Sequence, residues 1–321
     1  NCYYPKPADS TFKGWSWVVG ADAKLNDAWQ LGYSIGTGFR VPNASEMYFD
    51  YRDNAAGAWV SNPNLKAERS LTQNLKLTGS GKAGNLDVNL HHTRYKDFLY
   101  EQETLVQEDN PLYPLSPNPY RYKPVQQMQN MDKAKIYGIE MTGRLNLNSF
   151  TPIPEGWKLF GTLGYSRGNL SGDADLLSIQ PFKTVVGIDY EQPAGKWGVF
   201  TRLTHQGAKH AGDAKYKNCN SERSDEGVCT YDTWPHLNKS AWIFDMFGYY
   251  KPTKTLTFRA GVYNLFDRKY HTWDSLRGLN ITGGLVNSVG TRPNRIYGGY
   301  PGLERFYAPG RNYAVSLEWK F

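Results

Sequence analysis

Apolar and polar residues alternate along much of the chain. From Trp29 to Gly36 every second residue is a large apolar one, and the residues between are polar or glycine. The same alternation runs through the final segment, from Tyr313 to Phe321. Successive side chains of a β-strand point to opposite faces, whereas an α-helix would repeat every 3.6 residues. These segments therefore predict strands that are apolar on one face and polar on the other.

Eleven segments show this pattern, and each is about as long as a strand that crosses a membrane. The fold class that they predict is all-β. The segments lie at 15–25, 29–36, 70–79, 85–98, 134–146, 157–167, 182–191, 196–206, 239–251, 255–265 and 313–321.

The connections between these segments alternate in length. Short turns are expected at 26–27, 79–85, 193–195 and 252–254, with a somewhat longer one at 147–156. Long links fall between them, near 39–69, 99–133, 168–181, 207–238 and 266–311. Structureless loops of this length are uncommon in compact soluble domains. Outer-membrane barrels instead have short periplasmic turns and long extracellular loops, so the pattern indicates such a barrel.

An odd number of strands has a topological consequence. If the long links are extracellular, both the first and the eleventh strand run towards the periplasm. Bacterial single-chain barrels normally have an even number of strands and both ends in the periplasm. We therefore expect residues 1–321 to be the C-terminal half, about 11 antiparallel strands, of a 22-stranded transmembrane barrel. The remaining strands and the plug domain are expected outside this chain.

The composition agrees with a barrel only once the alternation is known. Of 321 residues 40% are hydrophobic, the mean hydropathy is −0.62, and no apolar run is long enough for a transmembrane helix. Read alone, these values would fit two soluble domains. A barrel shows lipid only alternate residues, so a low hydropathy is expected. Aromatic residues make up 15% of the chain, and the tryptophans near strand ends predict interfacial girdles; the core of a soluble sandwich is the alternative.

The net charge limits the kinds of partner that the chain could bind. The net charge of +7 suits a solvated basic surface or an anionic partner such as lipopolysaccharide. The Lys and Arg residues are scattered without a basic block, so nucleic acid is not expected.

Cys219 and Cys229 flank a polar stretch and favour a disulfide over a metal site, because no His or Cys partner lies near. Cys2 is left over, and its partner is expected upstream.

Several motifs resemble those of TonB-dependent outer-membrane receptors for haem and host proteins. Residues 38–48 resemble their FRAP-type box, and Asn62-Pro63-Asn64-Leu65 is similar to their NPNL box. Residues 262–270, with Asn264-Leu265-Phe266-Asp267, look like a near-terminal signature of the family. Residues 307–321 resemble the last strand of the neisserial-type haemoglobin and transferrin receptors. The resemblance extends from about Gly14 to Phe321 and is closest to haemoglobin receptors.

The resemblance implies a function without catalysis. A multi-pass receptor of the bacterial outer membrane would bind host haemoglobin and import haem as its transported ligand, not as a catalytic cofactor. Energy would come from a TonB-type complex acting through the absent plug half, and lipid and lipopolysaccharide would surround the barrel. A transferrin or lactoferrin receptor importing iron is the near alternative. An outer-membrane barrel enzyme, a protease or phospholipase, is the alternative from another class, but no catalytic motif appears.

The FRAP-like and NPNL-like region is where the resemblance places ligand contacts. Arg40 has an alternative role, as a loop-anchoring ion pair with Glu46 or Glu68. No histidine lies between residues 43 and 61. Tyrosinate can ligate haem iron, so two tyrosines are weak candidates for that role, and no other metal ligand is expected. The predicted contact residues are Phe39, Arg40, Pro42, Tyr48, Tyr51, Trp59, Asn62, Pro63, Asn64 and Leu65, with Tyr48 and Tyr51 the candidate haem ligands.

Overall fold

The computed structural model describes residues 9–53, 57–115, 118–219, 226–279 and 302–321. Cys2 and the middle of the last link, 280–301, lie outside these residues. In the described parts no helix is long and apolar enough to cross a membrane.

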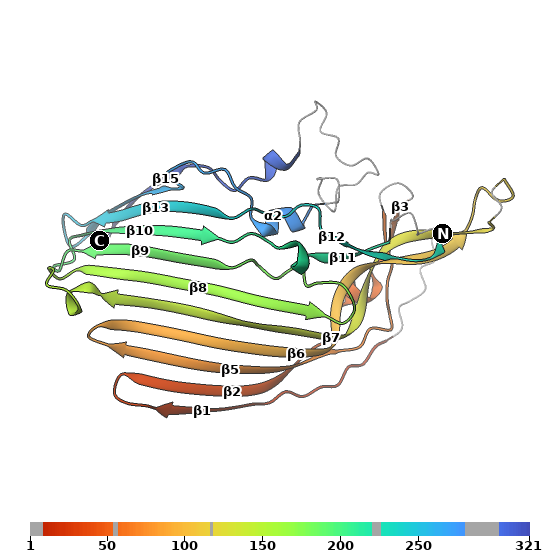
Figure 1. Ribbon diagram of the computed structural model, residues 1–321, viewed down its shortest axis with the longest axis horizontal. Coiled ribbons are helices and arrows are strands. Elements are labelled where there is room, and N and C mark those ends of the chain that lie inside the picture. Colours follow the sequence, from red (N-terminus) through yellow and green to blue (C-terminus); the bar gives the residue numbers. More distant parts are fainter. Residues whose placement is uncertain (1–8, 54–56, 116–117, 220–225, 280–301) are drawn as a thin grey trace.

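The fold is a single large antiparallel sheet, as the alternation predicts (Figure 1). Its main path has eleven strands, and their order in the sheet follows their order in the sequence. The expected number and order of strands are therefore confirmed. Two short strands, β3 (Tyr51–Asp53) and β4 (Gly57–Trp59), lie off the path. The path runs through β1 (Val18–Lys24), β2 (Trp29–Arg40), β5 (Glu68–Gly81), β6 (Gly84–Asp109), β7 (Tyr120–Asn146), β8 (Trp157–Leu170), β9 (Lys183–Glu191), β10 (Trp197–Gln206), β13 (Ala241–Tyr250), β14 (Leu256–Tyr263) and β15 (Asn312–Trp319).

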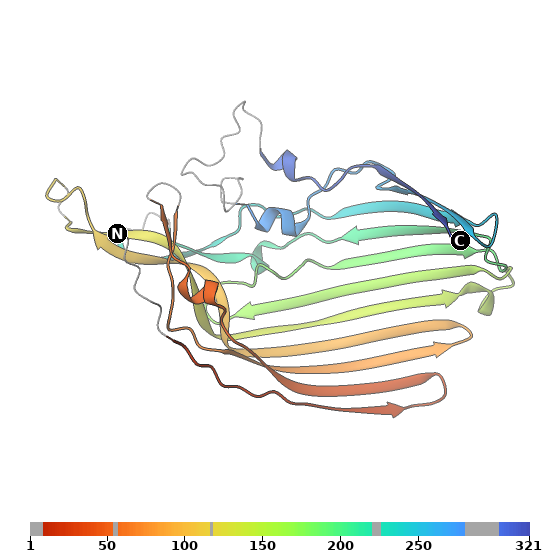
Figure 2. The same cartoon turned by 180° about the vertical axis from the view of Figure 1, so that it is seen from behind.

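Short turns gather at one end of the sheet and long links at the other (Figures 1 and 2). The link end also carries short elements of its own. They are α1 (Ala44–Tyr48), η2 (Ala211–Asp213), β11 (Lys215–Asn218), β12 (Thr230–Thr233), α2 (Trp273–Arg277) and η4 (Gly302–Phe306), while η1 (Leu147–Ser149) lies at the turn end.

The segment 99–133 differs from the loop that the sequence predicted. β6 and β7 stay paired from Gly84↔Leu145 to Asp109↔Tyr120, so most of this link is a two-stranded ribbon that projects beyond the sheet. The ladder skips only at Asp97, whose φ is 52°. The sequence analysis assigned strands only where apolar and polar residues alternate. Residues 99–109 and 120–133 do not alternate in this way. The backbone hydrogen bonds of the ribbon form nonetheless, so pattern reading ended the strands too early.

The strand register assigns one apolar face to the sheet, because paired residues share a face. Two aromatic rows border that face. One lies near the turns and the other near the links, eight residues away along β8, β9 and β13, a strand length of about 26 Å. This matches the apolar band of about 25 Å between the girdles of an outer-membrane barrel. The turn-side row is Trp157, Tyr190, Trp197, Tyr250 and Trp319, and the link-side row is Tyr137, Tyr165, Phe182, Trp242 and Tyr313.

The opposite face is polar and carries a buried charge cluster. Asp189 on β9 is 1% exposed, and both of its carboxylate oxygens accept hydrogen bonds from the Arg202 guanidinium. Arg144 on β7 lies 3.9 Å from the same carboxylate, and Arg202 stacks 4.3 Å from the centre of the Phe160 ring. The cluster therefore ties four neighbouring strands together on the face away from the apolar band.

Candidate functional site

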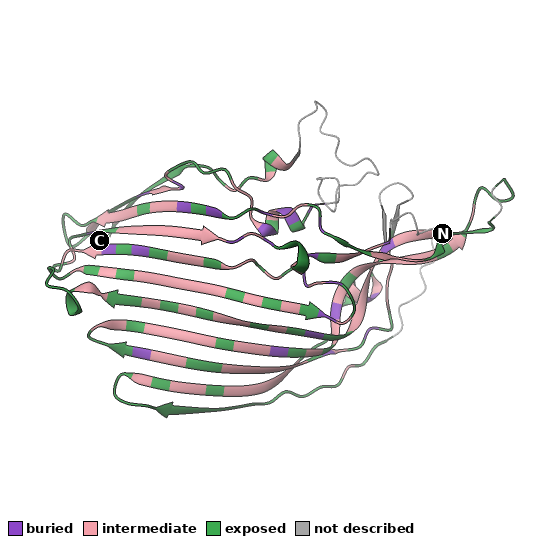
Figure 3. Ribbon diagram, in the orientation of Figure 1, coloured by how far each residue is buried: buried purple, intermediate pink, exposed green. Residues whose placement is uncertain are grey.

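The long links are not independent loops, because three buried apolar clusters join them into one layer. We call the segments 39–69, 99–133, 168–181, 207–238 and 266–279 the link layer. Buried residues gather around α2 and where β6, β7 and β8 meet the links (Figure 3). Each cluster draws side chains from more than one link, so the layer presents a shaped surface.

The first cluster brings together the two boxes that the sequence singled out. Met47 of the FRAP-like box packs with Leu65 of the NPNL-like box and with Leu99 of β6, and the three are 3%, 4% and 6% exposed. Tyr48 and Met128 pack against them. The two boxes, which are separate in the sequence, therefore share one apolar core.

The FRAP-like box folds as a strand end followed by the capped helix α1. Asn43 caps the helix: its side chain accepts from the Glu46 N–H at 2.9 Å, and Glu46 accepts from the Asn43 N–H at 2.9 Å. The Glu46 carboxylate also pairs with Arg40, so the anchoring ion pair expected as an alternative for Arg40 is present. Glu68, the other candidate partner, instead accepts from the Leu99 N–H at 3.0 Å.

The NPNL-like box is held against the ribbon by side-chain amides. Asn62 donates to the Met128 carbonyl at 2.9 Å and accepts from the Asn64 N–H at 3.2 Å. Asn130 on β7 accepts from the Lys66 N–H at 2.8 Å and donates to the Lys66 carbonyl at 3.0 Å. The turn that the sequence predicted is therefore held against β7 by these hydrogen bonds. Asn130 was not identified from sequence, because an isolated Asn in a strand carries no signal.

The predicted contact residues divide by exposure. Pro42 and Leu65 are buried, whereas Phe39, Arg40, Tyr51, Pro63 and Asn64 are exposed at the link end. Trp59 donates to the Glu101 carboxylate at 2.9 Å, and the Tyr48 hydroxyl lies 3.1 Å from the Ser10 hydroxyl. Among the described residues no group of three His, Cys, Asp or Glu side chains could hold a metal. Haem ligation by Tyr48 or Tyr51 stays a prediction.

Helix α2 and its neighbours form the core of a second part of the layer. Trp273 is fully buried, and its indole donates to the Leu177 carbonyl at 2.6 Å. The Trp234 indole donates to the Leu276 carbonyl at 3.1 Å. Three links therefore meet here, from 168–181, 207–238 and 266–279.

The expected disulfide between Cys219 and Cys229 is present. Cys219 is fully buried, and its N–H donates to the Glu103 carboxylate of β6 at 2.6 Å. Burial raises the pKa of Glu103, while this hydrogen bond and Lys217 act in the opposite direction. The disulfide-closed loop is consequently tied to the projecting ribbon, a contact between residues more than 100 positions apart in the sequence.

In the signature at 262–270, Asn264 forms hydrogen bonds that hold separate segments together. Asn264 has φ 50° and is 4% exposed; its N–H donates to the Asp245 carboxylate at 2.7 Å. Its side chain accepts from the Arg268 N–H at 2.8 Å and donates to the Pro309 carbonyl at 3.2 Å. This one residue therefore joins β13, the start of the last link and the approach to β15.

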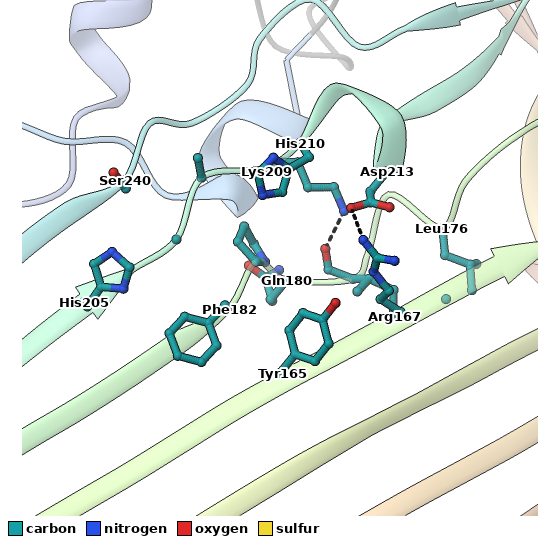
Figure 4. A pocket seen from close by; sticks show the side chains of 15 residues that line it. Tyr165, Arg167, Leu176, Gln180, Phe182, His205, Lys209, His210, Asp213 and Ser240 are labelled. Atoms are coloured by element: carbon teal, nitrogen blue, oxygen red, sulfur yellow. Dashed lines mark hydrogen bonds and ion pairs between the residues drawn. The ribbon is translucent and has the colours of Figure 1, made fainter.

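A pocket of about 470 Å³ opens at the rim, between the link-side ends of β8 and β10 and the segment 207–213 (Figure 4). Lys209 is 6% exposed, donates to the Ile179 carbonyl at 2.9 Å and lies 5.1 Å from the Trp273 ring. Burial lowers the pKa of this lysine. Arg167 of β8 pairs with Asp213 at 3.5 Å. No sequence motif marks this pocket.

Comparison with known proteins agrees with the fold and the motifs. Residues 3–265 match the family described as TonB dependent receptor-like, beta-barrel. The chain is 32% identical to hemoglobin-haptoglobin-binding protein A of Haemophilus influenzae, covering 97% of this chain and 28% of that protein. It is also 32% identical to hemoglobin-haptoglobin utilization protein B of Neisseria meningitidis serogroup A, covering 96% and 37%. Transferrin-binding protein A of N. meningitidis serogroup B is 32% identical, covering 97% and 32%.

The chain thus spans about a third of the length of these relatives. Among solved structures, the ferric enterobactin receptor of Pseudomonas aeruginosa superposes with a TM-score of 0.65 at 20% identity, covering 96% of this chain and 40% of that one. The copper transporter OprC gives 0.64 at 18% identity, covering 95% and 39%. The matched region includes ten of the eleven strands of the main path and both boxes. The chain belongs to the TonB-dependent receptor β-barrel family of the bacterial outer membrane.

Proposed function

We propose that this chain is the part of an outer-membrane receptor that binds host haemoglobin at the link layer and lets haem iron pass inward. The long links are then extracellular and the short turns periplasmic. TonB-supplied energy would act through regions of the receptor other than the strands described here. Haem is the transported ligand in this proposal, not a cofactor.

The link layer is the observation that carries the proposal. Its buried clusters hold five long links in fixed relation, so a partner meets a surface formed before binding, which lowers the ordering cost of association. Exposed aromatic and apolar groups remain on it, including Phe39, Tyr51, Leu112 and Tyr113. Such residues are typical of the contacts that dominate protein interfaces.

The family membership also settles the alternative from another class. Proteins of this family are receptors and transporters, so the outer-membrane protease or phospholipase is set aside. Six of the relatives carry haemoglobin in their names and two carry transferrin, at comparable identity. A transferrin receptor delivering bare iron therefore stays as the second candidate, with lactoferrin as a further ligand to test.

The test is retention of the intact protein on immobilised haemoglobin, transferrin and lactoferrin, with the Soret absorbance of the eluted complex as a second readout. We expect retention on haemoglobin and haem absorbance. Retention on transferrin alone would favour the second candidate, and retention on none would refute both.

Two variants locate the surface. Tyr51→Ala and Phe39→Ala remove exposed aromatic groups of the link layer and are each expected to weaken haemoglobin binding about tenfold if they are central contacts. Leu25→Ala is the control, because Leu25 is an apolar residue that is even more exposed (57%, against 38% for Phe39 and 39% for Tyr51) but lies in the short turn between β1 and β2. Equal affinities of all three variants would exclude this part of the link layer from the interface.

A further inference from the structure

The rim pocket faces the side of the sheet that contacts lipid. In β8, Tyr165 pairs with Ile139 and Arg167 pairs with Tyr137, so both side chains belong to the apolar face. His205 of β10 pairs with Trp242 on the same face, and their rings lie 4.4 Å apart. The centres of the Phe182 and His205 rings lie 6.0 Å apart. The pocket wall is therefore continuous with the membrane-facing surface.

The height of the pocket places it among lipid headgroups. Tyr165 and Phe182 belong to the link-side aromatic row, and aromatic girdles mark the boundary of the hydrocarbon core. Arg167 lies two residues beyond Tyr165, about 7 Å further along the strand. A group bound by Arg167 would therefore lie above the acyl chains at the level where phosphorylated headgroups begin.

The residues that line the pocket include two cationic side chains, Lys209 and Arg167, and one carboxylate, Asp213. Lys209 is buried, and among the residues that the structure describes no carboxylate lies within ion-pair distance of its ammonium. Asp213, the acidic group in the pocket, is already paired with Arg167. Asp213 and Asp175 act on Lys209 only from beyond ion-pair distance, and the Ile179 carbonyl and the Trp273 ring compensate a buried cation only in part. An anion in the pocket would supply the missing partner.

We infer that this pocket binds a phosphate group of a phosphorylated glycolipid in the outer leaflet. Lys209 and Arg167 would hold the phosphate by charge-assisted hydrogen bonds. Tyr165, Phe182 and His205 would line the path of the acyl chains below it. The inference rests on the proposed orientation, in which the link end is extracellular, and needs no haemoglobin.

The experiment measures lipid binding to the intact, delipidated protein in detergent by the shift in melting temperature on titration. Phosphorylated lipid A is the probe, and dephosphorylated lipid A and inorganic phosphate are the comparison ligands. We expect phosphorylated lipid A to stabilise the wild type. Lys209→Met and Arg167→Gln should each weaken its binding about tenfold, because each loses a hydrogen bond between charged groups. Lys215→Met is the control, since Lys215 is exposed on β11 and does not line the pocket.

Equal affinity of wild type and both pocket variants would overturn the inference. Equal stabilisation by dephosphorylated lipid A would show that phosphate is not recognised, and equal stabilisation by inorganic phosphate would show that the lipid is not; either result also overturns it. Arg167→Gln keeps the test valid if Lys209→Met does not fold, because Arg167 is largely exposed. Haemoglobin retention of the same variants is measured separately, so failure of the lipid site and failure of the receptor function are distinguishable.

Discussion

Replacement of Leu65 by alanine tests whether the two boxes act through a shared core. Leu65 is 4% exposed and packs with Met47 and Leu99, so truncation removes apolar contacts from both boxes and from β6. Leu→Ala substitutions in buried cores cost about 2–5 kcal/mol. The cluster lies in a layer of links that can partly collapse around the gap, so we expect the lower end, about 2 kcal/mol.

We expect this substitution to lower the free energy of local opening of the NPNL-like segment and to leave the stability of the sheet strands unchanged. A change of about 2 kcal/mol raises the population of the open state about thirtyfold. The amides of Val60, which donates to the Gln126 carbonyl at 3.0 Å, and of Lys66, which donates to Asn130, report this opening. Hydrogen exchange should accelerate by that factor at both, while amides in β9 stay unchanged.

The matched control is Leu115→Ala, which removes the same atoms from a side chain that is 92% exposed at the tip of the ribbon. It should leave the exchange of Val60 and Lys66 unchanged. If Leu65→Ala does not accelerate these amides, the boxes do not depend on this core and the hydrogen bonds of Asn62 and Asn130 hold the segment alone.

Three further substitutions probe the polar contacts. Asp189→Ala leaves the Arg202 guanidinium, which is only 16% exposed, without its carboxylate partner, so we expect the free energy of unfolding in urea to fall by about 3 kcal/mol. Removing the disulfide by Cys219→Ser with Cys229→Ser should destabilise its loop by about 2–3 kcal/mol, seen as faster limited proteolysis there. Because burial raises the pKa of Glu103, the folded state that buries this carboxyl should lose stability as pH rises from the ordinary Glu value to the raised one and then level off; Glu103→Gln should remove this dependence, measured by urea unfolding at each pH.

Each of these has a result that would contradict it. Urea stability equal to wild type in Asp189→Ala would mean that water reaches the arginine and replaces the carboxylate. Unchanged proteolysis of the serine variant would show that the hydrogen bond to Glu103 suffices to hold the loop. A wild-type pH profile that persists in Glu103→Gln would assign the titration to another group.

Much of the barrel was readable from local pattern. Alternation located all eleven strands because a strand with one lipid-facing side needs an apolar residue at every second position, and the short turns and Cys219–Cys229 followed from spacing and composition. The ribbon of β6 and β7 was missed because neither of its faces has the apolar contrast of the sheet. The register of the strands was not predicted, because local alternation does not say which residues face each other across two strands; His91 and His92, for example, pair with Asn74 and Gln73 respectively.

The sequence by itself determined the class of fold, the number and order of strands, the family boxes and the disulfide, because these depend on neighbouring residues or on short spacings. The tertiary structure alone decided which links share a core and where a buried cation meets a lipid-facing rim. Met47 with Leu65, Cys219 with Glu103, and Lys209 with Arg167 become neighbours only after strands far apart in the chain have paired. Such contacts are set by the register of the whole sheet, and no local periodicity encodes them.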